Sequence, residues 1–172
     1  MGLLLTPPTF TWVGGSWIQV RVAGRRSRRT LATVGVMLVA VGVAGTSFVV
    51  AHDAPLAVVA IAFAVAGLGM GLSYSPTALV ALSEAETGRQ GAATSAVLLS
   101  DTLGAALGAG IGGAIVAAAP SLDWTRRDAL AVVFGLMTVV ALLGVAVARR
   151  FPPDPPDLGT AVPVTSANGE TP

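Results

Sequence analysis

Long runs of apolar residues alternate with short polar links along most of the chain. A hydrocarbon core about 30 Å thick is crossed by about 20 residues of α-helix. Four runs meet that length, at residues 31–50, 56–82, 92–118 and 129–148. Residues 1–14 are apolar too, but at about 1.5 Å per residue they reach only about 21 Å, and two prolines interrupt them. The pattern predicts an all-α integral membrane protein with about five transmembrane helices, the first one truncated, in one transmembrane domain over 1–150.

Composition agrees with a membrane protein and excludes several other classes. The chain is 53% hydrophobic and 11% charged, with a mean hydropathy of +0.78, which is far from the usual soluble mixture. It has no cysteine and one histidine, His52, so we expect no disulfide, no thiolate nucleophile and no metal site. Glu84 and Glu86 form a lone acidic pair, which is typical of a solvated turn. We expect no enzymatic activity, no cofactor and no nucleic-acid partner.

The arginines predict the orientation of the chain in the bilayer. Lys and Arg are retained on the cytoplasmic side of a membrane. Eight arginines fall in links and ends on one side, whereas Arg126 and Arg127 are on the other. An odd number of spans then places the C terminus in the cytoplasm. The eight are Arg21, Arg25, Arg26, Arg28, Arg29, Arg89, Arg149 and Arg150.

The last segment, residues 151–172, differs from the rest. It has six prolines in 22 residues and no apolar periodicity. Such a composition does not form a packed core. We expect a disordered cytoplasmic tail.

Glycines recur at helix-packing spacing in two of the apolar segments. In lipid, helices associate through small residues that let their backbones approach. Such faces are typical of close packing in any polytopic protein, and in a transporter they also let helices slide or rock; the sequence leaves both interpretations open. The expected packing residues are Gly67, Gly71, Gly104, Gly108 and Gly112.

One carboxylate, Asp101, lies inside the apolar run 92–118. On a helical wheel it falls within about 60° of Gly104, Gly108 and Gly112, so it faces another helix or a cavity rather than lipid. Its depth is about 15 Å, where insertion of a carboxylate costs about 2.5 to 3.5 kcal/mol. Protonation, a hydrogen bond from Ser100 or Thr102, or a water-filled pathway would offset that cost. A proton-carrying transport residue and a protonated acid that merely bonds a neighbouring helix are equally open.

The polar stretch 73–77 interrupts the apolar run 56–82. Pro76 removes a backbone donor and kinks a helix, and nearby hydroxyl groups can satisfy the carbonyl oxygens it frees. Tyr74 either lines a cavity or lies at the cytoplasmic interface. The candidates for a proton or substrate pathway are Asp101, Tyr74, Ser73 and Thr94.

Three stretches together resemble the C-terminal half of a major facilitator superfamily transporter, in particular the fourteen-helix drug:proton antiporter branch. They are GSWIQVRVAGRRSRRTL, AGLGMGLSYSPTALVAL and ETGRQGAATSAVLLSDTLGAALGAGIGGAIV. The order of a basic loop, a Gly-rich helix, an acidic link and an LGxALGxGxGG helix carries the resemblance, which extends over residues 1–150. It implies a partial major-facilitator helical bundle.

The basic stretch resembles that family's cytoplasmic loop motif, roughly G-x-x-x-D-R-x-G-R-R, in a degenerate form. Arg25, Arg28 and Arg29 match its basic positions, whereas Gly24 replaces the acid and Ser27 the second glycine. The resemblance implies a cytoplasmic gating loop at residues 15–31, which also contains Arg21. A merely solvated positive loop would have the same sequence.

The resemblance implies the C-terminal portion of a proton-coupled secondary transporter, an exporter of drugs or other small molecules in a bacterial inner membrane. The proton gradient would supply the energy, and Asp101 would be a proton or cation site. Such transporters bind substrate between two halves, so the partners would be the lipid bilayer and, once an N-terminal half completes the cavity, a small-molecule substrate. The alternative is a non-transporting membrane interaction module or an inactive transporter fragment.

Overall fold

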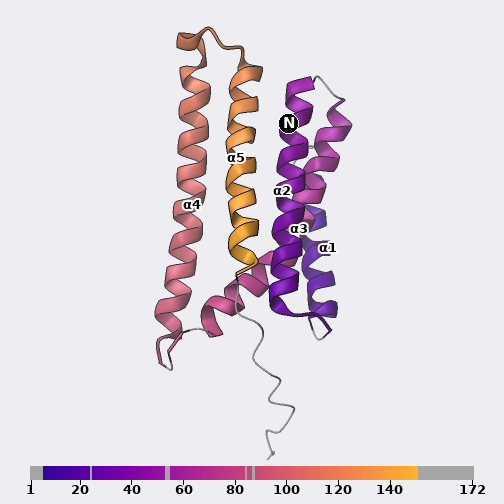
Figure 1. The fold of residues 1–172 in the computed structure, drawn as a ribbon, viewed down its shortest axis with the longest axis vertical. Coiled ribbons are helices and arrows are strands. Elements are labelled where there is room, and N and C mark those ends of the chain that lie inside the picture. Colours follow the sequence, from indigo (N-terminus) through magenta and orange to yellow (C-terminus); the bar gives the residue numbers. More distant parts are fainter. Residues whose placement is uncertain (1–5, 24, 53–54, 84, 87, 151–172) are drawn as a thin grey trace, which may run out of the picture.

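The described residues form a bundle of five long α-helices, whose arrangement Figure 1 shows. The computed structural model describes residues 6–23, 25–52, 55–83, 85–86 and 88–150. Within them, four helices are long and apolar enough to cross a membrane: Arg28–His52, Ala57–Leu82, Gln90–Leu122 and Arg126–Ala148. The predicted all-helical membrane fold is therefore confirmed. The elements are α1 (Thr6–Val22), α2 (Arg28–His52), α3 (Leu56–Ser83), α4 (Gln90–Ala118), the short 3-10 helix η2 (Ala119–Leu122) and α5 (Arg126–Ala148).

The first helix, α1, differs from the truncated span expected at residues 1–14. Within the described residues it extends from Thr6 over 17 residues to Val22, eight residues beyond the expected span, and it includes Pro7 and Pro8. The expected loop over 15–31 is correspondingly shorter, and Arg21 lies in the last turn of α1. Residues 1–5 and the expected tail, 151–172, lie outside the described residues.

Helix α3 packs between α1 and α2 through glycines on two of its faces. A Cβ added at Gly71 would lie 2.7 Å from the backbone nitrogen of Ser16 in α1, and one added at Gly69 would lie 2.6 Å from the backbone nitrogen of Val39 in α2. Gly67, one turn before Gly71, also meets the backbone of α1. Residues four apart share a helix face and residues two apart do not, so this Gly-x-Gly-x-Gly run lets two helices approach α3 at once.

Helix α5 packs on the side of α2 that α3 leaves free (Figure 1). Gly144 of α5 lies against Val36 of α2, and an added Cβ would be 3.3 Å from its Cγ1 atom. The N-terminus of α5 is closed by a capping box in which the Thr125 hydroxyl accepts from the backbone N–H of Asp128 and the Asp128 carboxylate accepts from that of Thr125. This box fixes where α5 begins, directly after the link from α4.

Helix α4 stands at the edge of the bundle, beside α5 and the last turns of α3 (Figure 1). None of its described residues is buried in the chain, and large side chains such as Leu99 and Leu107 are about 60% exposed (60% and 62%). An apolar helix without covered faces is stable only against lipid or other helices. We therefore expect the exposed faces of α4 to contact lipid or further helices.

The helices run antiparallel to their neighbours in the chain, so the helix termini gather at two opposite ends of the bundle. At one of them α1, α3 and α5 end and α2 and α4 begin; we call it the basic end. The link between α3 and α4 at this end includes Gly88, whose φ of 88° is in the left-handed region, and an exposed ion pair of 3.3 Å between Arg89 and Glu86. The basic end carries Arg21, Arg25, Arg26, Arg28, Arg29, Arg89, Arg149 and Arg150.

Candidate functional site

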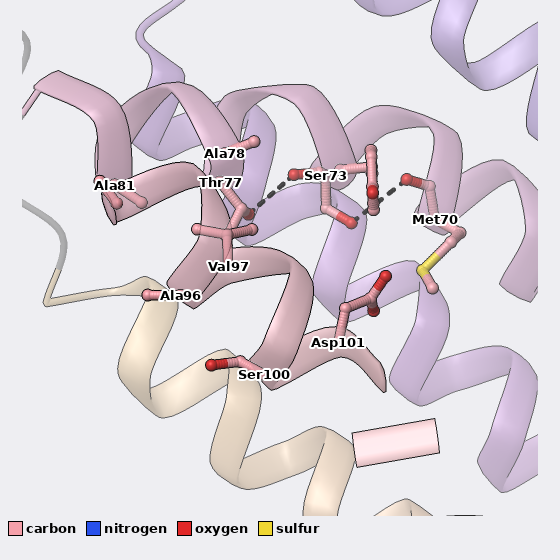
Figure 2. Close-up of a pocket in the computed structure, with 11 residues that line it drawn as sticks. Met70, Ser73, Thr77, Ala78, Ala81, Ala96, Val97, Ser100 and Asp101 are labelled. Carbon is pink, nitrogen blue, oxygen red and sulfur yellow. Dashed lines mark hydrogen bonds between the residues drawn. The ribbon is translucent and has the colours of Figure 1, made fainter. Parts of the chain in front are cut away.

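A cavity of about 640 Å³ lies between α3 and α4, in the half of the bundle nearer the basic end. Its volume is within the range of small-molecule sites, about 300–1,000 Å³. Figure 2 shows side chains of the two helices facing each other across it. The lining residues are Met70, Ser73, Tyr74, Thr77, Ala78 and Ala81 of α3 and Ala93, Ala96, Val97, Ser100 and Asp101 of α4.

The α3 wall consists of residues three and four apart, which share one face of a helix. Ser73 and Thr77 use their hydroxyl protons within this helix: Ser73 Oγ donates to the Gly69 carbonyl oxygen at 3.0 Å, and Thr77 Oγ1 donates to the Ser73 carbonyl oxygen at 2.7 Å. These bonds flank Pro76, which lies inside the helix and is fully buried. The hydroxyl oxygens that remain toward the cavity are therefore acceptors.

On the α4 wall, Asp101 is the only carboxylate among the lining residues of the described chain. Its side chain points from α4 toward Met70 and Ser73 of α3 (Figure 2). It lies about 16 Å from the start of α4, at about 1.5 Å per residue. Within the part of the chain that the structure describes, no group donates a hydrogen bond to this carboxylate, and Thr102, one of the two neighbours that could have done so, donates instead to the Leu98 carbonyl oxygen at 2.8 Å.

Tyr74 brings an aromatic surface to the cavity from α3. Its side chain is 43% exposed, so a ligand can reach it. Its ring centroid lies 6.2 Å from that of Trp12 in α1, with the planes tilted by 53°, an aromatic contact within the favourable range. The contact ties the cavity wall to α1.

Three of the four pathway candidates from the sequence therefore line one cavity, and Thr94 is outside it. Thr94 Oγ1 donates to the Gln90 carbonyl oxygen at 2.9 Å, and Thr94 is not among the lining residues. Sequence reasoning missed Met70 and Ser100 as lining residues. The signal for Met70 was present, because it shares a face of α3 with Ser73, Tyr74 and the turn after them.

The expected packing glycines of α4 have few neighbours in the described chain. An added Cβ at Gly104 would meet nothing within 4 Å. At Gly108 and Gly112 the nearest atoms belong to α5 side chains, Met137 Cε at 3.9 Å and Val133 Cγ1 at 3.4 Å. In contrast to α3, α4 thus brings no glycine against another backbone here.

The arginines of the expected gating loop are divided between helix ends and a short link. Arg21 stacks over the ring of Trp17, with 3.6 Å from its Cζ atom to the ring centroid, which is a cation–π contact. Arg28 and Arg29 lie in the first turn of α2, and Arg29 donates to the carbonyl oxygen of Arg149, the residue directly after α5. Arg25 remains in the link between α1 and α2 and is exposed.

The described residues contain no group of three His, Cys, Asp or Glu side chains that could hold a metal ion. What the arrangement offers chemically is one carboxylate, acceptor hydroxyls, a thioether and an aromatic ring around a small-molecule-sized space. Those groups can bind a ligand and exchange a proton.

Four membrane-length helices in the described chain define a multi-pass membrane protein, and a cavity with one carboxylate lies between two of its helices. The chain belongs to the major facilitator superfamily, whose family model matches residues 1–169. It is thus a member of a family of membrane transporters. Neither the curated proteins nor the solved structures include a match to it.

Proposed function

We propose that this chain is the C-terminal part of a proton-coupled secondary transporter that exports drugs or other small molecules, and that Asp101 is its proton-carrying group. The observation that carries the proposal is the position of Asp101, on the wall of the cavity between α3 and α4 without a hydrogen-bond donor in the described chain. The finer assignment, to the C-terminal half and the drug:proton antiporter branch, rests on the sequence resemblance.

The energetics of Asp101 support this role. A carboxylate at mid-membrane depth costs about 2.5 to 3.5 kcal/mol. A structural acid would offset this cost with fixed hydrogen bonds, whereas Asp101 has none from the described residues. A group that must take up and release a proton needs access to water and freedom from fixed donors, and an open cavity supplies both.

The loose packing of α4 supports a moving wall. Helix α3 packs against α1 and α2, and α5 packs against α2. Helix α4, in contrast, has no buried residue. Transporters expose a central site to either side of the membrane by rocking one group of helices against another. Displacing α4 from α3 would open the cavity without unpacking the glycine contacts of α3.

We further propose that the basic end is cytoplasmic and that the membrane is a bacterial inner membrane. The eight arginines at this end support the orientation through the retention of positive charge in the cytoplasm. The C terminus is then cytoplasmic as well, because α5 ends at the basic end. The proton gradient is the energy source in this proposal.

A second function is favoured by one observation, the uncovered surface of α4. The chain would then be a non-transporting membrane interaction module, or an inactive transporter fragment, whose α4 docks on another protein. This alternative predicts that the chain copurifies with a membrane partner and that Asp101 has no effect on solute movement.

The experiment that decides between them is solute uptake into inverted membrane vesicles containing a transporter that carries this chain. Fluorescent cationic, neutral and anionic solutes are offered under an imposed proton gradient. We expect gradient-dependent uptake of at least one solute, a loss of tenfold or more in Asp101→Asn, and little change in Thr102→Val, whose hydroxyl bonds within α4. Uptake that is equal in the Asp101→Asn variant would remove Asp101 from the mechanism.

A further inference from the structure

Helix α1 has an apolar stripe on the outside of the bundle. The helix lies on the side of the bundle away from α4 (Figure 1), and the stripe residues Phe10, Val13, Trp17 and Val20 are between 57% and 73% exposed. At 100° per residue these four positions fall within about 80° of one another. Gly15, on the opposite face of α1, is buried against α3. We call the four residues the α1 stripe; no other described helix covers it.

The α1 stripe is as long as one leaflet of a bilayer is deep. From Phe10 to Val20 a helix rises about 15 Å, which is half of a hydrocarbon core about 30 Å thick. The next residue, Arg21, lies in the last turn of α1 and is exposed. Because α1 ends at the basic end of a membrane-spanning bundle, the stripe lies at the depth of acyl chains, and Arg21 lies at the depth of the headgroups.

The contact between Arg21 and Trp17 leaves this arginine ready to bind a phosphate. Its Cζ atom lies 3.6 Å from the centroid of the Trp17 ring, a cation–π contact made by the face of the guanidinium. The N–H groups point outward from the edge of that plane, and no described residue accepts a hydrogen bond from them. A planar guanidinium with free edges can bind two oxygens of one phosphate.

Two more arginines are fixed beside the end of α1 by the backbone of the following link. The backbone N–H groups of Arg25 and Arg26 both donate to the Val22 carbonyl oxygen, at 2.8 and 3.0 Å, and both side chains are exposed. Among the described residues, Glu86 is the only acid at the basic end, and it is already ion-paired within the link between α3 and α4. Three cations without a described counter-charge thus lie at the end of the α1 stripe.

We propose that the α1 stripe, together with Arg21, Arg25 and Arg26, is a binding site for an anionic phospholipid. The phosphate group lies at the arginines, and an acyl chain lies along the stripe. An anionic headgroup is favoured over phosphatidylcholine because the choline group carries its own positive charge, which the arginines repel. The site is separate from the cavity between α3 and α4, and it needs neither proton coupling nor transport.

The test is quenching of Trp17 fluorescence by brominated phospholipids around the full chain in bilayers, since bromine on an acyl chain quenches the tryptophans that this chain contacts. Trp12→Phe and Trp124→Phe leave Trp17 as the only reporter. Brominated phosphatidylglycerol and brominated phosphatidylcholine are compared at equal mole fractions. We expect Trp17 to prefer phosphatidylglycerol by about fivefold or more, since one arginine near an anionic surface contributes roughly this factor. Equal quenching by the two lipids, or none by either because another helix covers the stripe, would overturn the proposal.

A matched pair of triple variants separates a site from general attraction to positive charge. Replacing Arg21, Arg25 and Arg26 by glutamine should remove the preference at Trp17. The control replaces three arginines of the same end that lie away from α1, and it should keep the preference: Arg89→Gln, Arg149→Gln and Arg150→Gln. Circular dichroism checks that both variants remain helical. A preference that persists in the first variant, or that both variants lose equally, would refute the site.

Inorganic phosphate distinguishes a lipid from a soluble anion. It carries the same group as the headgroup but has no acyl chain to place on the α1 stripe. Added to the phosphatidylglycerol bilayers, it should weaken the preference at Trp17 no more than potassium chloride of equal ionic strength, which screens the charges alone. Displacement of the lipid by phosphate beyond this salt effect would assign the arginines to a soluble anion and contradict the proposed lipid site.

Discussion

The side chain of Arg127, in the first turn of α5, donates a hydrogen bond from Nε to the backbone carbonyl oxygen of Val50, in the last turn of α2, over 2.6 Å. At the opposite end of the same antiparallel pair, Arg29 in the first turn of α2 donates to the carbonyl oxygen of Arg149, which follows the last turn of α5. The last carbonyl groups of a helix lack intrahelical partners and carry partial negative charge. Each helix thus caps the C-terminal end of the other, so we call the two contacts the reciprocal arginine caps.

The reciprocal arginine caps should stabilise the α2–α5 pair measurably. A hydrogen bond from a charged donor contributes about 1.5 to 3 kcal/mol, so Arg127→Gln should lower the free energy of unfolding by about that amount. Thermal unfolding in nanodiscs, followed by tryptophan fluorescence, measures the change. The matched control is Arg126→Gln, the preceding residue on the same helix turn. Equal midpoints for the two variants would show that the Val50 contact adds nothing.

Arg29→Gln tests the other end of the pair. More than 20 residues of helix separate the two caps. The effects of Arg29→Gln and Arg127→Gln on the free energy of unfolding should therefore add to within about 0.5 kcal/mol in the double variant. Arg25→Gln is the control, in nanodiscs without anionic lipid, because Arg25 lies exposed in the neighbouring link. This result would separate a capping role for Arg29 from a gating role, since a gating residue would alter uptake rates and leave the unfolding midpoint unchanged.

Two glycine substitutions, one in α3 and one in α4, should differ in their effect on stability. A Cβ at Gly71 would overlap the backbone of α1, with Ser16 N at 2.7 Å, so Gly71→Ala should destabilise the chain by about 1–3 kcal/mol. Gly104 has open space around it, and alanine is the better helix former by about 1 kcal/mol, so Gly104→Ala should be neutral or stabilising. The same unfolding assay in nanodiscs compares them. A loss of stability in Gly104→Ala as large as that in Gly71→Ala would mean that a partner already covers α4 in the nanodisc.

The orientation can be tested with reporter fusions in bacterial cells. A fluorescent protein that folds only in the cytoplasm and an alkaline phosphatase that is active only in the periplasm are each fused after Arg150. We expect fluorescence and no phosphatase activity, because the basic end should remain in the cytoplasm. The same two reporters fused after Asp123, in the link between α4 and α5, should give the converse result, which is phosphatase activity. The reversed pattern would invert the proposed topology.

Much of the fold was predictable because apolar length reports directly on membrane helices. The α2, α3, α4 and α5 helices cover the four apolar runs found in the sequence and extend up to three residues beyond them. The extensions follow from capping, as at Thr125 and Asp128, where polar residues that hydropathy assigns to a link complete the first turn. The estimate for α1 ended too early, at residue 14, because the helix continues to Val22 through polar residues that hydropathy assigns to a link.

The site was predictable only in part, since a helical wheel gives the face of a residue but not which helix it meets. It put Asp101 on a face with three of the glycines of α4, and the structure adds that α3 supplies the opposite wall with Met70 and Tyr74. The caps made by Arg29 and Arg127 could not be predicted for another reason. Their partners are backbone carbonyls 120 and 77 residues away, and no sequence pattern shows which distant carbonyl a side chain will meet.

The most direct measurement of the role proposed for Asp101 is proton movement caused by substrate. Inverted vesicles containing the transporter are energised until a pH-sensitive acridine dye is quenched, and a transported solute is then added. If Asp101 carries the proton, the unchanged protein should relieve the quench, Asp101→Glu should do so in part, and Asp101→Asn should give the response of empty vesicles. Relief of the quench by Asp101→Asn equal to that of the unchanged protein would contradict the assignment.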